Sequence, residues 1–458
     1  MGTVPVPAEA YYGSQTARAV TNFPVSGLVL PPALVHAMAL IKAHAARVNA
    51  ELGHLDGKLA GAIIRAAREV AEGRLDDQFV VDVFQTGSGT STHMNLNEVI
   101  AGRANEILTG RRGGRAPVHP NDHVNIGQSS NDVVPTAIHV AARLAVENKL
   151  NPALKHLAAV LEEKEKEFDP VAKIGRTHLQ DAVPMRLGQE FSGYAAQMRA
   201  AIERVDAVLP RLEELALGGT AVGTGLNADP AFAPAAIRAL AEETGIGFVE
   251  TRNHFQAQAA QDTAVELSGA LKTTAVSLVK IANDLRWLAS GPRCGLGEIN
   301  LPSLQPGSSI MPGKVNPVMF EMLNQVCYQV LGQDHAVALM TQAGQLELNV
   351  MMPAMGSALF DAMDWLTNAM NAATEKNLKG IAVNRERCAF FIHQSVGLAT
   401  LLNTQIGYMQ AAEIAKESEK SGRPVKDIVV EKGLMKAEDF DALVLSAAHG
   451  VGSGGGGG

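Results

Sequence analysis

Residues 267–288 read LSGALKTTAVSLVKIANDLRWL, and the spacing of their apolar side chains indicates the fold class. One face carries an apolar residue at every third or fourth position, with Thr274 filling one slot: Leu267, Leu271, Leu278, Ile281, Leu285 and Leu288. Side chains separated by three or four residues lie on the same face of an α-helix. This stretch therefore predicts one long amphipathic helix with a buried apolar stripe.

Two earlier stretches repeat the pattern. One stripe consists of Leu150, Leu154, Leu157 and Leu161, and another of Phe191, Tyr194, Met198, Ile202, Val205, Leu209 and Leu212. Several long helices with such stripes pack as a bundle. Hydrophobic residues make up 47% of the chain but aromatic residues only 4%, which favours closely packed helices over sheets. We expect an all-α protein whose central bundle of long helices spans residues 130–385.

The segments on either side of this bundle contain shorter helical patterns. Residues 1–129 mix helices at about 32–52 and 57–72 with loops. Residues 386–451 contain short helices at about 387–402, 408–421 and 425–432. Residues 452–458 are Gly-rich, and we interpret them as a flexible linker outside the fold. The chain is therefore expected to have an N-terminal mixed helical domain, the bundle, and a small C-terminal helical domain.

Composition excludes several classes of function. The net charge is −8 and no basic run occurs, so a nucleic-acid or anionic-membrane surface is not expected. No signal peptide and no apolar run of about 18 residues is visible. Three widely separated cysteines, an odd number, are typical of reduced thiols in a cytoplasmic protein. No metal-ligand motif such as HExxH is present, so we expect neither a metal nor another cofactor.

Residues 307–317 read GSSIMPGKVNP and form the most unusual polar stretch. Gly and Pro mark it as a loop rather than a helix. Two adjacent serines, followed by Lys314 and Asn316, place a potential proton acceptor beside groups that bind an anion. An ordinary surface loop can have the same composition. Composition alone leaves both interpretations open.

Three other polar segments also allow two interpretations. Residues 85–95 (QTGSGTSTHMN) and 128–132 (QSSND) precede helical patterns, where hydroxyls either cap the helix or bind an anion. Residues 173–181 (KIGRTHLQD) form a polar break between two expected helices. The single histidine there, His178, is either a structural residue or an acid–base group suited to neutral pH.

The order and content of these segments resemble the fumarase/aspartase superfamily. The superfamily pattern GSSxMPxKxN matches residues 307–316, and Ile310 together with Gly313 resembles class II fumarases in particular. SSND at 129–132, GRTHLQDA at 175–182 and GGTAVGTGLN at 218–227 resemble further motifs of that family. The resemblance extends from the N-terminus to about residue 445.

The resemblance implies the reversible addition of water to fumarate, giving malate, on a three-domain fold. It implies that Ser308 is the base, and that Lys314 and Asn316 stabilise the carbanion that forms. It also implies that His178, oriented by Glu321, serves the side of the leaving hydroxyl. The substrate-binding groups that it implies are Ser88, Gly89, Thr90, Ser129, Ser130, Asn131, Thr177, Ser309 and Val315.

Two further expectations come only from the resemblance. His119, Asn121 and Asp122 resemble a second, non-catalytic dicarboxylate site, although a surface turn of this composition needs no ligand. The motifs are dispersed along the chain, and in this superfamily each active site takes them from three subunits of a homotetramer.

Two alternative functions remain. Aspartases usually have STND at 129–132 and Ala at position 313, so Ser130 and Gly313 favour fumarase. However, residues 317–320 (PVMF) depart from many fumarases, and 345–349 (QLELN) are partly aspartase-like. Argininosuccinate and adenylosuccinate lyases fit less well around the lysine. A non-enzymatic structural protein on the same fold, as in some lens crystallins, would be free to lose the loop residues that are present here.

Overall fold

The computed structural model describes residues 2–449, so the expected Gly-rich linker at 452–458 lies outside the described residues. The chain forms two compact units. The first contains the chain up to Pro152, Ile202–Ala275 and Cys327–Thr367. The second contains Ala153–Ala201, Val276–Val326 and the chain from Asn368 on. Each change of unit falls inside a long helix: α6 Asn151–Phe168, α7 Leu187–Asp206, α11 Asp262–Leu288, α12 Val318–Gln342 and α13 Met352–Lys376.

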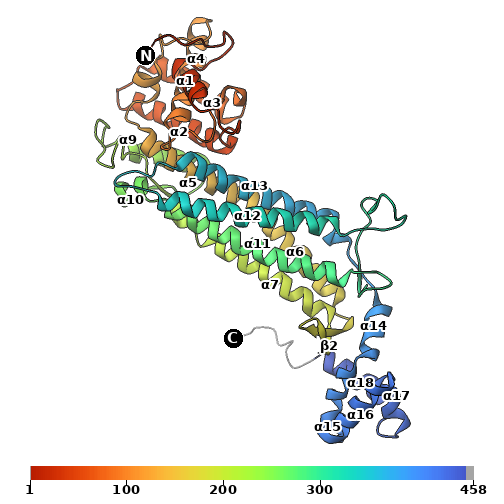
Figure 1. Cartoon of the computed structure of the whole chain (residues 1–458). Coiled ribbons are helices and arrows are strands. Elements are labelled where there is room, and N and C mark those ends of the chain that lie inside the picture. Colours follow the sequence, from red (N-terminus) through yellow and green to blue (C-terminus); the bar gives the residue numbers. More distant parts are fainter. Residues whose placement is uncertain (1, 450–458) are drawn as a thin grey trace. The chain divides into compact units, whose positions relative to one another are not determined.

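The first unit is built around α2 (Pro32–Glu51), which packs against α3 (Gly57–Ala71) and α5 (Ser130–Ala145) (Figure 1). The side chain of Asp56 caps α3 by accepting from the amides of Lys58 and Leu59. The other elements are α1 Ser14–Asn22, η1 Asp76–Gln78, α4 Thr90–Thr109, η2 Pro120–Val124, η3 Val146–Leu150, α8 Leu209–Leu212, β3 Glu214–Leu215, α9 Phe232–Thr244, β4 Val249–Glu250 and α10 His254–Ala259.

In the second unit, parts of α6, α11, α12 and α13 pack around a small apolar space. Its lining includes Leu157 and Leu161 of α6, Leu278, Ile281 and Leu285 of α11, Phe320 and Leu323 of α12, and Met370 and Ala373 of α13. The leucine stripes predicted from the sequence therefore face the interior of a helical bundle.

A hairpin and a cluster of short helices complete the second unit. Strands β1 (Ala172–Thr177) and β2 (Gln180–Arg186) pair antiparallel, and β2 contacts α18 (Ala437–His449). In Figure 1 the short helices are drawn in blue beside β2. Ile174 of β1 shares their apolar core with Leu398, Ile414, Ile428 and Phe440. The remaining elements are β5 Ile299–Asn300, η4 Leu378–Gly380, β6 Ala382–Val383, α14 Arg385–Gln394, η5 Val396–Leu402, α15 Asn403–Ile406, α16 Tyr408–Ser421 and α17 Val425–Glu431.

The all-α fold class is confirmed, with two local differences. Residues 173–181, expected as a break between helices, belong to the β1–β2 hairpin. The stripe from Phe191 to Leu212 is not one helix, because α7 ends at Asp206 and α8 begins at Leu209, where Pro210 lacks a backbone donor. Among residues 2–449, no helix has both the length and the apolar character needed to cross a membrane.

Candidate active site

The first unit brings three predicted hydroxyls together at the starts of α4 and α5. Thr90 Oγ1 lies 2.8 Å from Ser88 Oγ and 2.7 Å from Ser130 Oγ. Ser88 and Ser130 are buried, so these hydroxyls bond to one another rather than to solvent. Gly89 precedes α4 with φ of 75°, and a Cβ there would lie 2.9 Å from Val134. Glycine at this position therefore allows the two helix starts to approach.

The start of α5 is fixed by its own caps and by the glycine-rich turn at 218–225. Ser129 accepts from the Asn131 amide at 3.2 Å, and Asp132 accepts from the Ser129 amide at 2.9 Å, forming a capping box. Asp132 is fully buried and also accepts from the amides of Gly218 and Thr220 at 3.0 and 3.1 Å. These bonds hold the predicted hydroxyls and the Asn131 amide beside two helix N-termini, an arrangement that can bind a carboxylate.

In the predicted second dicarboxylate site, the side chains of His119 and Asp122 contact each other. The His119 side chain accepts from the Asp122 amide at 3.2 Å, and its Nδ1 lies 3.1 Å from Asp122 Oδ2. Asp122 is 74% exposed and Asn121 is also exposed. The bonds within this surface turn account for its conformation, and the second site stays a prediction.

Thr177 and His178 lie at the tip of the β1–β2 hairpin, where both side chains are exposed. The two-residue turn consists of His178 and Leu179, whose φ angles are 57° and 59°. Such turns usually contain Asn or Gly, because left-handed backbone is strained for other residues. Strain of this kind is concentrated at functional sites, where the surrounding structure maintains it.

The loop at 307–317 is closed by bonds across its base. The Gly307 amide donates to Lys314 O at 2.8 Å, and Asn316 Nδ2 donates to Gly307 O at 2.7 Å. A Cβ on Gly307 would lie 2.4 Å from Lys314 O, so only glycine allows this closure. Ser308 Oγ accepts from the amides of Ile310 and Met311 at 3.2 and 3.0 Å. Two such donors stabilise negative charge on a hydroxyl oxygen.

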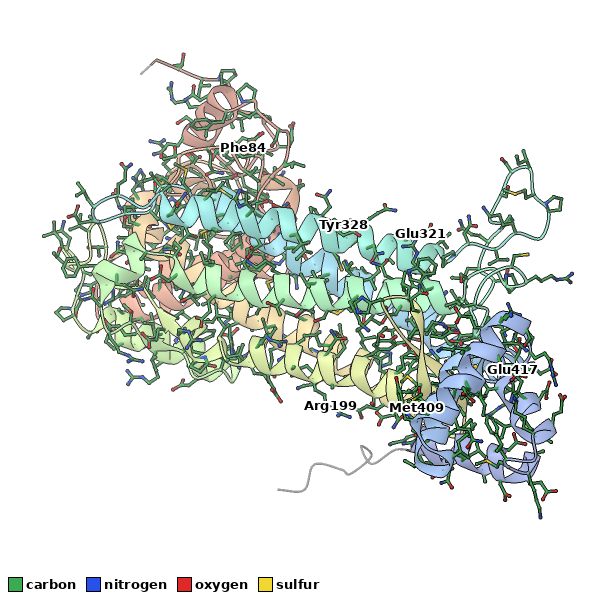
Figure 2. All side chains as sticks on the ribbon, turned by 60° about the horizontal axis from the view of Figure 1, so that its bottom comes forward. Phe84, Arg199, Glu321, Tyr328, Met409 and Glu417 are labelled. Carbon is green, nitrogen blue, oxygen red and sulfur yellow. The ribbon has the colours of Figure 1, made fainter. Side chains whose placement is uncertain are left out.

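A cavity of about 730 Å³ lies beside this loop in the second unit. Lys314, Val315 and Asn316 line it together with Glu321, which Figure 2 shows on the first turn of α12. Ser308, Ser309, Thr177 and His178 are not among its lining residues. The cavity therefore combines one ammonium, one amide and one carboxylate from the predicted catalytic set.

Sequence reasoning missed two other groups of this cavity, Asn283 and Arg286 of α11. Arg286 Nη1 donates to Asn283 Oδ1 at 3.0 Å, and Asn324 Nδ2 of α12 donates to the same oxygen at 2.9 Å. The signal available in the sequence was the polar pair at spacing i, i+3 near the end of an amphipathic helix. These bonds join the end of α11 to the beginning of α12.

Comparison with known proteins identifies the family. The family model described as Lyase matches residues 2–332, and the one described as Fumarase C C-terminus matches residues 398–447. A class II fumarate hydratase from Neisseria meningitidis is 50% identical over 98% of this chain and 97% of its own. One from Halobacterium salinarum is 54% identical over 97% of this chain and 94% of its own. The chain belongs to the class II fumarate hydratase family.

The fold agrees with this family membership. The crystal structure of a class II fumarase from Schistosoma mansoni matches with a TM-score of 0.91, at 42% identity, over 96% of this chain and 95% of that one. The sequence-based recognition of a class II fumarase is confirmed. In this member of the family, residues 2–449 contain no group of three or more His, Cys, Asp or Glu side chains placed to hold a metal ion.

Proposed function

We propose that this protein catalyses the reversible hydration of fumarate to L-malate, a step of the citric acid cycle. The identity of about 50% to class II fumarate hydratases over nearly the whole chain carries this proposal. The chemical groups required for the reaction are also present at the loop, the hairpin and the hydroxyl cluster described above.

In the dehydration direction, the base removes a proton from the carbon next to a carboxylate of malate. We assign this step to Ser308, whose Oγ accepts from two backbone amides. The electron pair of the broken C–H bond moves into the neighbouring carboxylate and gives an aci-carboxylate. Lys314 and Asn316 are the groups assigned to stabilise this extra charge, which preorganised donors do most effectively.

The hydroxyl on the other carbon must then leave as water. His178 is assigned to donate or position the proton that this oxygen takes up, while the carbon–oxygen bond breaks and the double bond forms. Glu321 is assigned to orient the imidazole and to balance its positive charge. In the hydration direction the same groups act in reverse, so that the hydroxyl and the proton add to opposite faces of fumarate.

The two substrate carboxylates also need hydrogen-bond donors that hold them in place. We assign this binding to the hydroxyl cluster of Thr90 and Ser130 with Ser88, Gly89, Ser129 and Asn131, and to Thr177, Ser309 and Val315. The cluster consists of hydroxyls and amides at two helix N-termini, which suit a dianion in a protein of net charge −8.

We also propose a homotetramer whose active sites each take residues from three subunits, and a cytoplasmic location. Large apolar side chains remain exposed on α11 and α12, including Val276, Trp287, Leu339 and Tyr328, the last labelled in Figure 2. An interface between subunits would bury such exposed apolar side chains. Light scattering of the purified protein tests the tetramer, and cell fractionation tests the location.

The test of the function is the ultraviolet absorbance of fumarate, measured with L-malate in one reaction and L-aspartate in another. The proposal predicts that fumarate forms from malate alone. Formation from aspartate would establish an aspartase and give weight to the unusual residues at 317–320. If a correctly assembled protein forms fumarate from neither substrate, the result would favour a non-enzymatic structural protein.

A further inference from the structure

Glu298 is a buried carboxylate that none of the roles assigned above uses. It lies in the second unit, directly before β5, and its side chain is 0% exposed. Its backbone is fixed on both sides, because its amide donates to Leu288 O and its carbonyl accepts from the Asn384 amide, each at 2.8 Å. A charge removed from water is destabilising unless it is paired, so the partners of this carboxylate indicate its role.

Both cationic partners of Glu298 come from β1. Arg176 Nη1 donates to Glu298 Oε1 at 2.9 Å, and Lys173 Nζ lies 3.1 Å from Glu298 Oε2. The Lys173 side chain is 2% exposed and also donates to Glu190 Oε2 at 2.6 Å. Glu298 thus pairs with two positive charges on the strand that leads to His178.

The hairpin is irregular between the two cationic residues. In a regular strand, residues three apart point to opposite faces of the sheet. The register of the hairpin shifts between Ile174 and Arg176, where β2 carries one residue more than β1. Gly175 of β1 lies at this shift, and a Cβ there would lie 3.0 Å from Val183 O. Bulges of this kind redirect side chains and often lie beside active sites.

The end of β1 leads directly into the strained turn. Arg176 is followed by Thr177 and by His178, whose left-handed backbone persists only where its surroundings hold it. Beyond Glu298, Ile299 and Asn300 line the cavity that contains Lys314 and Glu321. Glu298 therefore joins the hairpin to the segment that forms the cavity wall.

We propose that Glu298 is a positioning residue for the hydration reaction, acting through Lys173 and Arg176 to fix β1 and the turn that presents His178. The inference rests on the proposed function. It assigns to Glu298 no contact with the substrate and no proton transfer. Its effect is on the rate of the chemical step, because small displacements of an acid–base group reduce rates strongly.

The test replaces Glu298 by Gln, which preserves the side-chain shape but removes the anion beside Arg176 and leaves Lys173 paired with Glu190 alone. We expect kcat with L-malate to fall at least about tenfold while KM changes less than about threefold. The matched control is Glu162→Gln on α6, which removes the partner of the exposed Arg199, labelled in Figure 2, and leaves both constants unchanged. Light scattering and circular dichroism verify that each variant is assembled and folded.

A rescue experiment separates positioning from general damage. Glu298→Asp keeps the anion between Lys173 and Arg176 and is expected to have a kcat at least about threefold higher than Glu298→Gln. If Glu298→Gln does not assemble, Arg176→Lys tests the inference instead. This variant preserves the charge but not the guanidinium geometry, so kcat should fall about fivefold. A parent enzyme active on L-malate, with unchanged kcat in the assembled Glu298→Gln or Arg176→Lys variant, would overturn the inference. Inactivity of the parent itself would instead count against the proposed function.

Discussion

Thr90 Oγ1 and Ser130 Oγ lie 2.7 Å apart, although 40 residues separate them in the chain. They belong to the first turns of α4 and α5, so their contact brings two helix N-termini together. Each hydroxyl can rotate about its C–O bond and so can donate either to its neighbour or to a carboxylate. This pair is the centre of the substrate-binding group assigned to the first unit.

Replacing Thr90 with Val removes one hydroxyl and preserves the shape of the side chain. A hydrogen bond to a charged group contributes about 1.5–3 kcal/mol, so kcat/KM for L-malate should fall roughly tenfold to a hundredfold. Steady-state kinetics on the purified variant measures this change. Thr21→Val on α1, where the hydroxyl only bonds to Ala17 O, is the control and should leave kinetics unchanged. Equal values for Thr90→Val and the parent would exclude Thr90 from carboxylate binding.

Replacing Ser308 with Ala removes the oxygen assigned as the base. Turnover should fall at least ~10²-fold, the usual size of an acid–base contribution, while the protein remains assembled. Single-turnover rates with L-malate test the chemical step directly. Ser303→Ala, at an exposed position four residues before the loop at 307–317 (the signature loop), is the matched control and should retain the parent rate. A Ser308→Ala variant with near-parent rates would require a different base.

His178→Asn tests the group on the hydroxyl side without disturbing the hairpin. Asn tolerates left-handed backbone better than most residues, so the turn at φ of 57° is retained. We expect at least a ~10²-fold loss of turnover, from loss of proton transfer rather than loss of structure. The pH dependence of kcat in the variant and the parent provides the readout. An unaltered profile at an unaltered rate would show that His178 has no acid–base role.

The burial of Lys42 makes the free energy of unfolding depend on pH. Lys42 is fully buried on α2, donates to Asn125 Oδ1 at 2.8 Å, and lies in the field of the buried Asp132. Burial lowers the pKa of Lys42 from 10.5 to about 7, although Asp132 acts in the opposite direction. Burial also holds the pKa of the neighbouring His93 well below its usual range. Between about pH 7 and pH 10.5, Lys42 carries a proton in the unfolded chain but not in the folded chain. The free energy of unfolding therefore falls as the pH decreases towards 7.

Lys42→Met removes this cost at a similar side-chain volume. The free energy of unfolding of the variant should therefore exceed that of the parent most near pH 7. This excess should be smaller by roughly 2 kcal/mol at pH 9, at about 1.4 kcal/mol per pKa unit. Urea unfolding of both proteins at the two pH values measures the difference. A constant difference between them would show that Lys42 keeps its proton in the folded protein.

The sequence predicted the long helices well, because apolar spacing reports directly on buried faces. Leu278, Ile281 and Leu285 all line the bundle interior, as expected from their intervals. The signature loop was also recognisable, since its glycines and prolines exclude a helix. The division into three domains and the roles of the site residues stay predictions.

The hairpin could not be predicted from local sequence. Residues 172–186 lack the alternation of β-branched residues and the Asn-Gly turn that indicate a hairpin. Its strands depend on distant partners instead: Glu298 pairs with Lys173 and Arg176, and Ile174 packs among the C-terminal helices. Arg286 was missed for a similar reason, because its place in the cavity depends on how the end of α11 meets the beginning of α12.

The most direct test of the shared active site is complementation between two inactive variants. Thr90→Val combined with Ser130→Ala disables the hydroxyl cluster in one protein, and Ser308→Ala disables the loop in the other. If each site takes these groups from different subunits, mixed tetramers formed by refolding equal amounts should regain about a quarter of parent activity, since each group is intact in half of the subunits. A mixture as inactive as its two components, despite proven mixed assembly, would contradict an active site shared between subunits.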